Sequence, residues 1–228
     1  MTDNALIIFI KNPMKGKVKT RIARTAGDDA ALEIYLELSK ITRDNVLLFR
    51  QETHVSDTSA ILRGVKIYLF YSDFIGTNDE WSNNYFDKQV QTGEDLGERM
   101  YNAFDFVLKT HRHACIIGSD CPTLSVEIMN QAFHQLSTFD CVLGPSTDGG
   151  YYLLGIKKPE NEAKSDDLHF SQIIRHLFDN MVWSTEQVLS NTLQRIKENS
   201  QTVFLLPELT DIDEEADWLY FQKNKQGK

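Results

Sequence analysis

Short unbroken apolar runs alternate with longer stretches in which apolar residues recur at helical spacing. The apolar runs lie at residues 6–10, 114–117, 141–143, 151–156 and 203–206, and residues 65–70, interrupted only by Lys66, form a further run of this kind. The helical repeat covers residues 28–49, 96–109, 125–136, 171–178 and 184–197, and a last helix is expected to begin at Asp213. Residues 184–187 match a capping box, which predicts a helix start there. Unbroken apolar runs are typical of strands buried on both faces, and their alternation with helices implies parallel pairing. We therefore expect an α/β fold with a mostly parallel central sheet.

Two polar stretches interrupt this alternation. Residues 71–95 are polar with scattered aromatic residues, which predicts an irregular excursion with one short helix around Trp81. Loops of this length are often functional. Residues 157–167 are highly charged and predict a second loop. Because the chain has no internal repeat, low-complexity segment or linker, we expect residues 1–228 to form a single domain.

The composition is that of an ordinary globular protein. Hydrophobic residues make up 41% of the chain and charged residues 25%. The net charge of −9 argues against nonspecific binding to nucleic acid. No apolar run approaches the ~20 residues that a membrane span needs, and the N-terminus lacks a signal-peptide pattern. We therefore expect a cytoplasmic protein with no nucleic-acid partner and no membrane span.

The basic charge is concentrated just after the first predicted strand. Residues 11–24 hold six lysines and arginines and no acid, and Pro13 and Gly16 break regular structure there. Lysines, backbone N–H groups and a bidentate arginine suit such a loop to a polyphosphate. The candidate phosphate-binding residues are Lys11, Pro13, Gly16, Lys17, Lys19, Thr20 and Arg21. The spacing is not that of a P-loop, and the alternative is a solvated basic loop.

A single carboxylate, Asp120, follows the apolar run at residues 114–117. Gly118 permits a tight exit from that strand, and Pro122 stiffens the loop beyond it. In open α/β sheets, ligands bind at the carboxyl ends of the strands. An Asp at that edge can hold Mg²⁺ or Mn²⁺ together with substrate phosphates. The alternative is that Asp120 only caps the helix that begins near Ser125.

A second carboxylate, Asp148, also follows a predicted strand. The two glycines after it, Gly149 and Gly150, would let backbone approach a ligand. An Asp-Gly pair between two strands is also a strong signal for a hairpin turn. Both interpretations are open from this segment alone.

A third acidic segment lies near the C-terminus. Residues 208–217 hold six acids and no base, among them Asp211 and Asp213. Asp213 is also in position to cap the last helix. We expect Asp120 and Asp148 to lie on one rim, with Asp120 binding the metal and Asp148 contacting metal or acceptor. Asp211 or Asp213 is the alternative second metal carboxylate.

The cysteines and histidines suggest no additional chemistry. The three cysteines have neither the spacing of a metal site nor that of a disulfide framework. Cys115 and Cys141 fall in apolar runs, and no local feature activates Cys121 as a nucleophile. His111 and His113 fit a solvated turn better than a zinc site, because no third ligand has a suitable spacing.

In a parallel sheet, the basic loop and the three acidic segments could meet at one edge. Basic groups there would hold phosphates, and acids would hold a divalent ion that bridges them. This arrangement suits transfer from a nucleotide donor to a small-molecule acceptor. The residues expected to carry catalysis are Lys19, Arg21, Asp120 and Asp148, and those expected to contact substrate are Gly149, Gly150 and Tyr151.

Several short segments, in order along nearly the whole chain, carry a family resemblance. They lie at residues 11–13 with 16–21, 91–100, 118–122, 144–145 with 148–155, 183–185 and 211–213. On these segments the chain resembles the bacterial glycosyltransferase-like family of radical-SAM/selenodomain-associated transferases. Asn12 departs from the pattern, because a small apolar residue is expected in its place.

The resemblance implies a single-domain, three-layer GT-A-like fold, that of the nucleotide-diphospho-sugar transferase superfamily. The chain is also similar to phospholactate guanylyltransferases and molybdenum-cofactor guanylyltransferases. In those relatives a basic loop after the first strand holds the nucleotide phosphates, which implies that role for residues 11–21. Their metal-binding Asp corresponds to Asp120.

Three functions are compatible with these observations. A glycosyltransferase would move a sugar from a nucleotide-sugar, which the family name and the candidate stacking surfaces Tyr151 and Tyr152 favour, although both tyrosines also suit an ordinary strand. A nucleotidylyltransferase would join a nucleoside triphosphate to a phosphorylated acceptor, which the lysine-rich loop favours. A regulatory module would bind nucleotide without turnover. We expect the first, a metal-dependent transferase using Mg²⁺ or Mn²⁺ and a nucleotide-diphospho-sugar donor.

Overall fold

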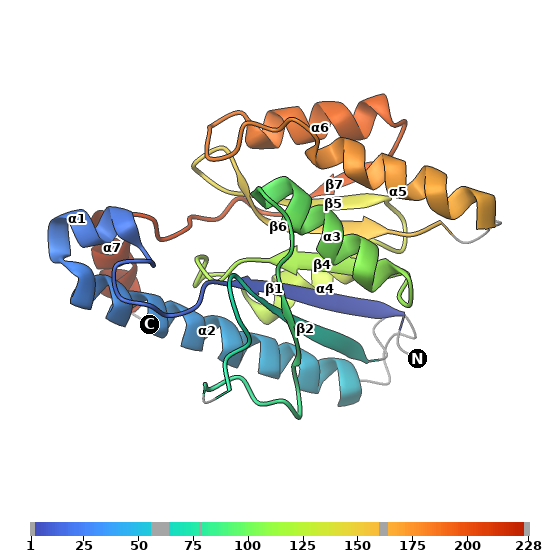
Figure 1. Ribbon diagram of the computed structural model, residues 1–228. Helices are drawn as coiled ribbons and strands as arrows, with labels where there is room; N and C mark the ends of the chain where they lie inside the picture. The colour runs from blue at the N-terminus through green and yellow to red at the C-terminus, as the bar shows by residue number, and fades with distance from the viewer. Residues whose placement is uncertain (1–2, 56–63, 78, 160–163, 226–228) are drawn as a thin grey trace.

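Seven strands and seven helices alternate in the computed structural model, which describes residues 3–55, 64–77, 79–159 and 164–225 (Figure 1). The strands are β1 (Asn4–Ile10), β2 (Val65–Tyr71), β3 (Asp87–Val90), β4 (His113–Ile117), β5 (Cys141–Pro145), β6 (Tyr151–Lys157) and β7 (Val203–Leu205). The helices are α1 (Thr20–Ala26), α2 (Asp28–Val55), α3 (Leu96–Leu108), α4 (Val126–Gln135), α5 (Lys164–Phe178), α6 (Val188–Glu198) and α7 (Glu215–Lys225).

The strands form one sheet in the order β3-β2-β1-β4-β6-β5-β7. β1 lies inside the sheet and pairs in parallel with β2 and β4. The pairs of β2 with β3 and of β5 with β7 are also parallel, whereas β6 runs antiparallel to β4 and β5. The predicted α/β fold with a mostly parallel central sheet is therefore confirmed.

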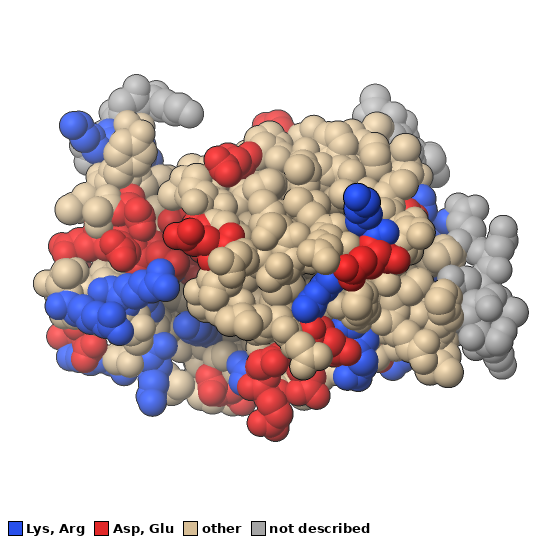
Figure 2. Space-filling model, turned by 90° about the horizontal axis from the view of Figure 1, so that it is seen from above, with Lys and Arg blue, Asp and Glu red and all other residues tan. Residues whose placement is uncertain are grey.

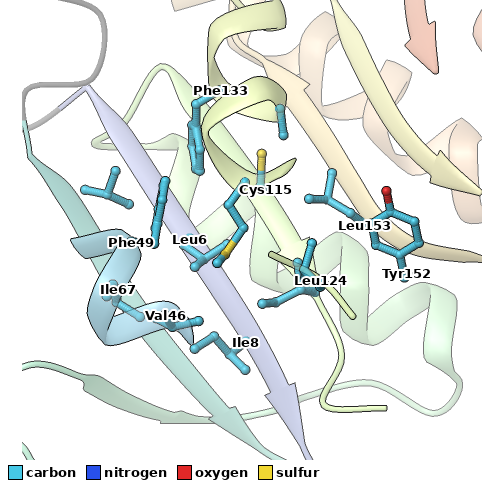
Figure 3. Packing of buried hydrophobic residues seen from close by; sticks show 14 of the residues in the cluster. Leu6, Ile8, Val46, Phe49, Ile67, Cys115, Leu124, Phe133, Tyr152 and Leu153 are labelled. Atoms are coloured by element: carbon cyan, nitrogen blue, oxygen red, sulfur yellow. The ribbon is translucent and has the colours of Figure 1, made fainter. Parts of the chain in front are cut away.

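Alternate residues of β1 enter two hydrophobic cores, one on each face of the sheet. Leu6 and Ile8 pack with Phe49 of α2 and Phe133 of α4 on one face (Figure 3). Ile7 packs on the other face, in a cluster that includes residues of α3 and α5. Successive strand residues point to opposite faces, so a strand covered by helices on both sides is apolar throughout. Burial of each such side chain contributes about 1.5–3 kcal/mol.

A third, smaller core holds α1 and α7 against α2. Ile22 of α1, Leu38 of α2 and Trp218 of α7 are buried together there. In Figure 1 α1 and α7 lie side by side at the left of the molecule, beside the first turns of α2. Packing of α7 beside α1 brings residues 211–213, which precede α7, close to the loop that follows β1.

The polar stretch 71–95 contains an edge strand that the sequence prediction missed. β3 pairs with β2, but its residues are only half-buried and three of the four are polar, so it shows no apolar run. The short helix expected around Trp81 does not form in the described residues 79–86, which contain turns instead. Trp81 is buried in edge-to-face contact with Phe86, and its backbone N–H group donates to the Asp79 carboxylate at 3.1 Å. Burial of this aromatic pair fixes the segment without a helix.

The capping box expected at residues 184–187 also does not form. α6 begins only at Val188, and its N-cap residue makes no side-chain capping bond. Ser184 has a left-handed backbone with φ 61°. A Cβ atom on Gly97 would lie 2.8 Å from the Trp183 ring, which shows how closely this segment packs on α3. Tertiary packing therefore outweighs the local capping signal.

Two helices begin inside stretches that were predicted to be loops. α1 begins at Thr20, within the basic segment 11–24, and α5 begins at Lys164, within the charged segment 157–167. Residues 160–163 lie outside the described residues. None of the described helices has the length and apolar character needed to cross a membrane.

Candidate functional site

A cleft of about 790 Å³ lies at the carboxyl ends of β1 and β4 and the amino end of the antiparallel strand β6. Its wall includes Lys19 of the basic loop and three of the predicted carboxylates, Asp120, Asp148 and Asp211. Figure 2 shows acidic side chains gathered beside basic ones on the side of the molecule that carries α1 and α7. The predicted convergence of the basic and acidic segments is thus present in the structure.

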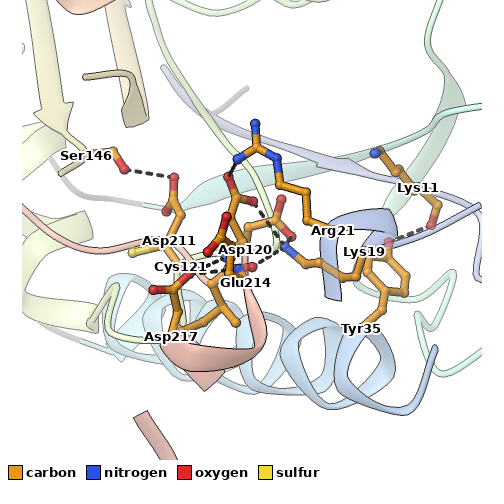
Figure 4. Close-up of polar contacts among 12 residues, drawn as sticks. Lys11, Lys19, Arg21, Tyr35, Asp120, Cys121, Ser146, Asp211, Glu214 and Asp217 are labelled. Atoms are coloured by element: carbon orange, nitrogen blue, oxygen red, sulfur yellow. Dashed lines mark hydrogen bonds and ion pairs between the residues drawn. The ribbon is translucent and has the colours of Figure 1, made fainter. Parts of the chain in front are cut away.

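Lys19 is the basic residue most deeply placed in this cleft. Its side chain is only 6% exposed, and its ammonium Nζ lies 2.6 Å from Oδ1 of Asp120 (Figure 4). The same ammonium donates to the carbonyl oxygen of Ile212 at 2.6 Å and lies 3.9 Å from Asp213 Oδ1. Lys19 therefore joins the segment after β4 to the segment before α7.

The rest of the basic loop divides into a part that lines the cleft and a part that does not. Arg21 lies in the wall and its Nη1 donates to Asp213 Oδ2 at 3.2 Å, while Thr20 also lines the cleft. Lys11 lines the cleft with an exposed side chain, and its carbonyl accepts from the Tyr35 hydroxyl at 2.6 Å. The predicted residues outside the wall are Pro13, Gly16 and Lys17, which form the turn beyond it.

Asp120 and the 211–213 segment are joined through backbone as well. The N–H group of Ile212 donates to the Asp120 carbonyl at 2.8 Å. The Asp213 carboxylate pairs with Arg21 and Lys19, while the N–H groups of Asp213 and Glu214 donate to the carboxylate of Asp217. Asp217, and not Asp213, thus serves the start of α7, so the capping alternative for Asp213 is wrong.

Asp211 is the most strongly perturbed carboxyl group of the cleft. The Ser146 hydroxyl donates to its Oδ2 at 3.0 Å, whereas its Oδ1 is buried without a hydrogen-bond partner among the described residues. Burial, together with the nearby charges of Asp120, Asp148 and Asp213, raises the pKa of Asp211 to about 6. Such a group favours a proton or a cation close to it.

Asp148 occupies the turn between β5 and β6. Its Oδ1 accepts from the Gly150 N–H at 2.9 Å, and the Ser146 N–H donates to the Gly150 carbonyl at 3.0 Å. The hairpin-turn interpretation of this Asp-Gly pair is therefore correct for its backbone. Asp148 and Gly150 still line the cleft, so the turn carries a carboxylate to its rim.

Gly149 is required by close packing against the segment before α6. Its φ is +86°, and a Cβ atom there would lie 2.3 Å from the carbonyl oxygen of Glu186. The Leu189 N–H donates to the Gly149 carbonyl at 2.9 Å. Gly149 thus does not line the cleft itself but holds two segments of its wall together.

The two candidate stacking tyrosines are largely enclosed. Tyr152 is 4% exposed, its ring lies against Gly144, and its hydroxyl donates to the Pro207 carbonyl at 2.8 Å. Tyr151 lines the cleft, but its hydroxyl is buried. Burial raises the pKa of both phenols. Both rings border the cleft, but Tyr152 serves mainly as a core residue, because its hydroxyl is held by the Pro207 carbonyl.

Cys121 is part of the cleft wall but is not an activated thiol. It is 7% exposed, and burial raises its pKa to about 12, with the charge of Asp211 adding to the effect. A thiol with this pKa carries almost no thiolate at neutral pH. The expectation that Cys121 is not a nucleophile agrees with its surroundings.

The cleft also contains residues to which sequence reasoning gave no role. Arg99 of α3 donates from Nε to the Gly93 carbonyl at 3.1 Å, and it forms no ion pair with any described residue. Trp183 and the left-handed Ser184 lie in the same wall. Segments 91–100 and 183–185 were noted only for their family resemblance. They follow no long apolar strand, so the strand-end rule that found the carboxylates could not find them.

The acidic rim fits a divalent ion that is held in part by substrate. No three His, Cys, Asp or Glu side chains in the described ranges lie close enough together to form a complete metal site. Mg²⁺ is commonly held by one or two carboxylates together with substrate phosphate oxygens. The buried, unpartnered Oδ1 of Asp211 is an oxygen that such an ion would satisfy. The residues best placed to hold it are Asp120 and Asp211, with Asp148 on the same rim.

Comparisons with known proteins identify a family and a fold. The family model DUF2064, described as an uncharacterized protein conserved in bacteria, matches residues 57–185, more than half of the chain. No curated protein matches the sequence of the chain. A solved structure of a "putative nucleotide-diphospho-sugar transferase" from Desulfovibrio desulfuricans G20 is 25% identical with a TM-score of 0.74, covering 94% of this chain and 84% of that one.

Two more distant structures share the fold. The 4-diphosphocytidyl-2C-methyl-D-erythritol synthase of Anaerococcus prevotii DSM 20548 is 8% identical with a TM-score of 0.60, and 99% of each chain is covered. The inositol-1-phosphate CTP transferase of T. maritima is 13% identical with a TM-score of 0.51, covering 95% of this chain and 92% of that one. At these identities the likeness concerns the fold alone. The chain therefore belongs to the DUF2064 family and has the fold of the nucleotide-diphospho-sugar transferases.

Proposed function

We propose that this protein is a metal-dependent transferase that uses a nucleotide-diphospho-sugar donor and a small-molecule acceptor. In this proposal, residues 1–228 form one nucleotide-binding transferase domain. The observation that carries the proposal is the contact of Lys19 with Asp120 in a cleft at the strand ends. A phosphate-binding cation and a metal-binding carboxylate lie side by side there, as transfer from a charged donor requires. The likeness to the D. desulfuricans structure supports the sugar donor.

The basic wall of the cleft would hold the donor phosphates. Lys11, Lys19, Thr20 and Arg21 line it from the end of β1 to the first turn of α1. Arg21 is half-exposed and can turn its guanidinium toward a phosphate while remaining near Asp213. Pro13, Gly16 and Lys17 would act indirectly, by shaping the turn and adding positive potential.

The acidic rim would hold Mg²⁺ or Mn²⁺ through Asp120 and Asp211. Bound there, the ion supplies neutralisation of the charge that develops on the leaving nucleoside diphosphate. Asp148 would lie at the acceptor side of the same rim, and Gly150 and Tyr151 would contact the acceptor beside it. Gly149 would keep this wall in place through its close contact with Glu186.

Nucleotidylyl transfer to a phosphorylated acceptor is the second candidate. It is favoured by the number of cations in the cleft, because Lys11 and Arg99 form no ion pair with a described residue and could accept additional phosphate groups. The A. prevotii and T. maritima enzymes, whose names describe cytidylyl chemistry, share the fold. A regulatory module that binds nucleotide without turnover is a third candidate. The association with radical-SAM enzymes, and a cytoplasmic location, likewise stay predictions.

The test is a thermal-shift comparison of nucleoside triphosphates and nucleotide-sugars, each with and without Mn²⁺, followed by product analysis. We expect a nucleotide-sugar with Mn²⁺ to raise Tm most, and turnover to release a nucleoside diphosphate. Release of pyrophosphate would identify the nucleotidylyl reaction instead. Binding without any product would favour the regulatory module. Lys15→Ala should show the same thermal shifts as the parent, because Lys15 lies in the basic loop, pairs with Asp29 and does not line the cleft.

A further inference from the structure

The ammonium group of Lys19 lies among oxygens that attract a cation. Three acceptors surround it: Asp120 Oδ1 at 2.6 Å, the Ile212 carbonyl at 2.6 Å and Asp213 Oδ1 at 3.9 Å (Figure 4). The side chain is 6% exposed, so little water competes for these contacts. Two of its N–H donors can bond the two oxygens at 2.6 Å, while Asp213 contributes a negative charge at longer range.

The backbone at Lys19 is also unusual. Its φ of 46° and ψ of 48° are left-handed, although it is not a glycine and makes no side-chain cap for α1. A non-glycine residue holds this conformation only when its surroundings stabilise it. The contacts of the ammonium group with Asp120 and Ile212 are the interactions that can do so.

Lys19 and a divalent ion cannot share Asp120 without repulsion. Both are cations, and one carboxylate oxygen of Asp120 is already in contact with Nζ. A lysine ammonium is strongly hydrated and sits on a flexible stem, so it can move to a nearby anion. Arg21 would remain beside Asp213 and would not take over the contact with Asp120.

We propose that Lys19 is a built-in counter-cation that makes metal binding depend on the donor nucleotide. In the ligand-free protein its ammonium neutralises Asp120. When donor phosphates enter the cleft, Lys19 turns to them and leaves Asp120 to the divalent ion. Nucleotide and metal therefore bind together, and the metal alone binds weakly. This inference rests on the proposed function, because it assumes that Asp120 is a metal ligand.

The test is a titration with MnCl₂ in the absence of nucleotide, in which the electron paramagnetic resonance signal reports free Mn²⁺. The variants are Lys19→Gln and Lys19→Met, which remove the charge and keep much of the stem. Lys15→Gln is the control, because it removes the same charge from the same loop away from the cleft. We expect both Lys19 variants to bind Mn²⁺ at least tenfold more tightly than the parent, and Lys15→Gln to bind like the parent.

Equal or weaker Mn²⁺ binding by the Lys19 variants would overturn the inference. If the parent is still stabilised by nucleotide with Mn²⁺, the proposed function survives that result. If neither the parent nor any variant binds metal with or without nucleotide, both the inference about Lys19 and the proposed metal-dependent function are wrong.

A second measurement does not depend on the folding of the Lys19 variants. Asp120→Asn keeps the shape of the side chain and releases Lys19 from its charged partner. In EDTA, this variant should bind inorganic pyrophosphate at least tenfold more tightly than the parent, because Lys19 is free to turn to it. Asp29→Asn, which removes an acid that pairs with Lys15 outside the cleft, is the control for net charge. Parent-like pyrophosphate binding by Asp120→Asn would contradict the inference.

Discussion

Replacement of Gly149 by Ala tests how the wall of the cleft is built. Gly149 has a φ of +86°, and an added Cβ atom would lie 2.3 Å from the Glu186 carbonyl oxygen and 2.5 Å from the Glu186 Cα atom. Both neighbours are backbone, so they cannot give way by a change of rotamer. The left-handed backbone should cost Ala about 1–2 kcal/mol, and the overpacking about 1–3 kcal/mol more.

Gly16 offers a matched control for the backbone part of this cost. Its φ is +76°, but a Cβ atom there would meet nothing closer than the Asp28 carboxylate oxygen at 3.6 Å, an ordinary contact. Gly16→Ala should therefore lose only about 1–2 kcal/mol of the free energy of unfolding. Urea denaturation of both variants measures the difference. If Gly149→Ala and Gly16→Ala lose the same free energy, the close contact between the two segments is not real.

Three other substitutions or treatments test single features. Arg21→Ala should weaken nucleotide binding by about 1.5–3 kcal/mol in isothermal titration, because a charged hydrogen bond to phosphate is lost. The exposed Arg24 of the same helix is the control, and unchanged affinity in Arg21→Ala would mean that the loop is only a solvated basic segment. Arg99→Ala should raise the KM for donor or acceptor roughly tenfold, about 1.4 kcal/mol; a parent-like KM would show that Arg99 contacts neither substrate. The three buried cysteines should resist labelling by a thiol reagent at pH 7 and react fully in urea, because burial raises the thiol pKa values, that of Cys121 to about 12; rapid labelling of the native protein would contradict this burial.

The strands of the inner sheet were predictable because their burial on both faces leaves an apolar run. β1, β2, β4, β5 and β6 all lie where such runs were found. β3 was missed because an edge strand is only half-covered and can be polar. The reversed direction of β6 follows from a tight turn that the Asp-Gly pair at Asp148 signals only locally.

The candidate site was predictable as a set of segments but not as a set of contacts. The strand-end rule located Asp120 and Asp148 because both directly follow buried strands. It could not show that Lys19 contacts Asp120, because that contact depends on a left-handed residue inside a loop. The place of Asp211 depends on the packing of α7 on α1 and α2 through Trp218, and no local pattern encodes that long-range contact.

Mn²⁺ binding by Asp120→Asn in the presence of nucleotide tests the central claim most directly. The nucleotide is the one that most raises the Tm of the parent, and Asp148→Asn is measured beside it. We predict that Asp120→Asn loses at least tenfold in Mn²⁺ affinity and loses turnover. Parent-like affinity in Asp148→Asn alone would make Asp148 a turn residue and leave Asp211 as the second carboxylate. If Asp120→Asn binds Mn²⁺ and turns over substrate like the parent, the metal site proposed at the end of β4 is wrong.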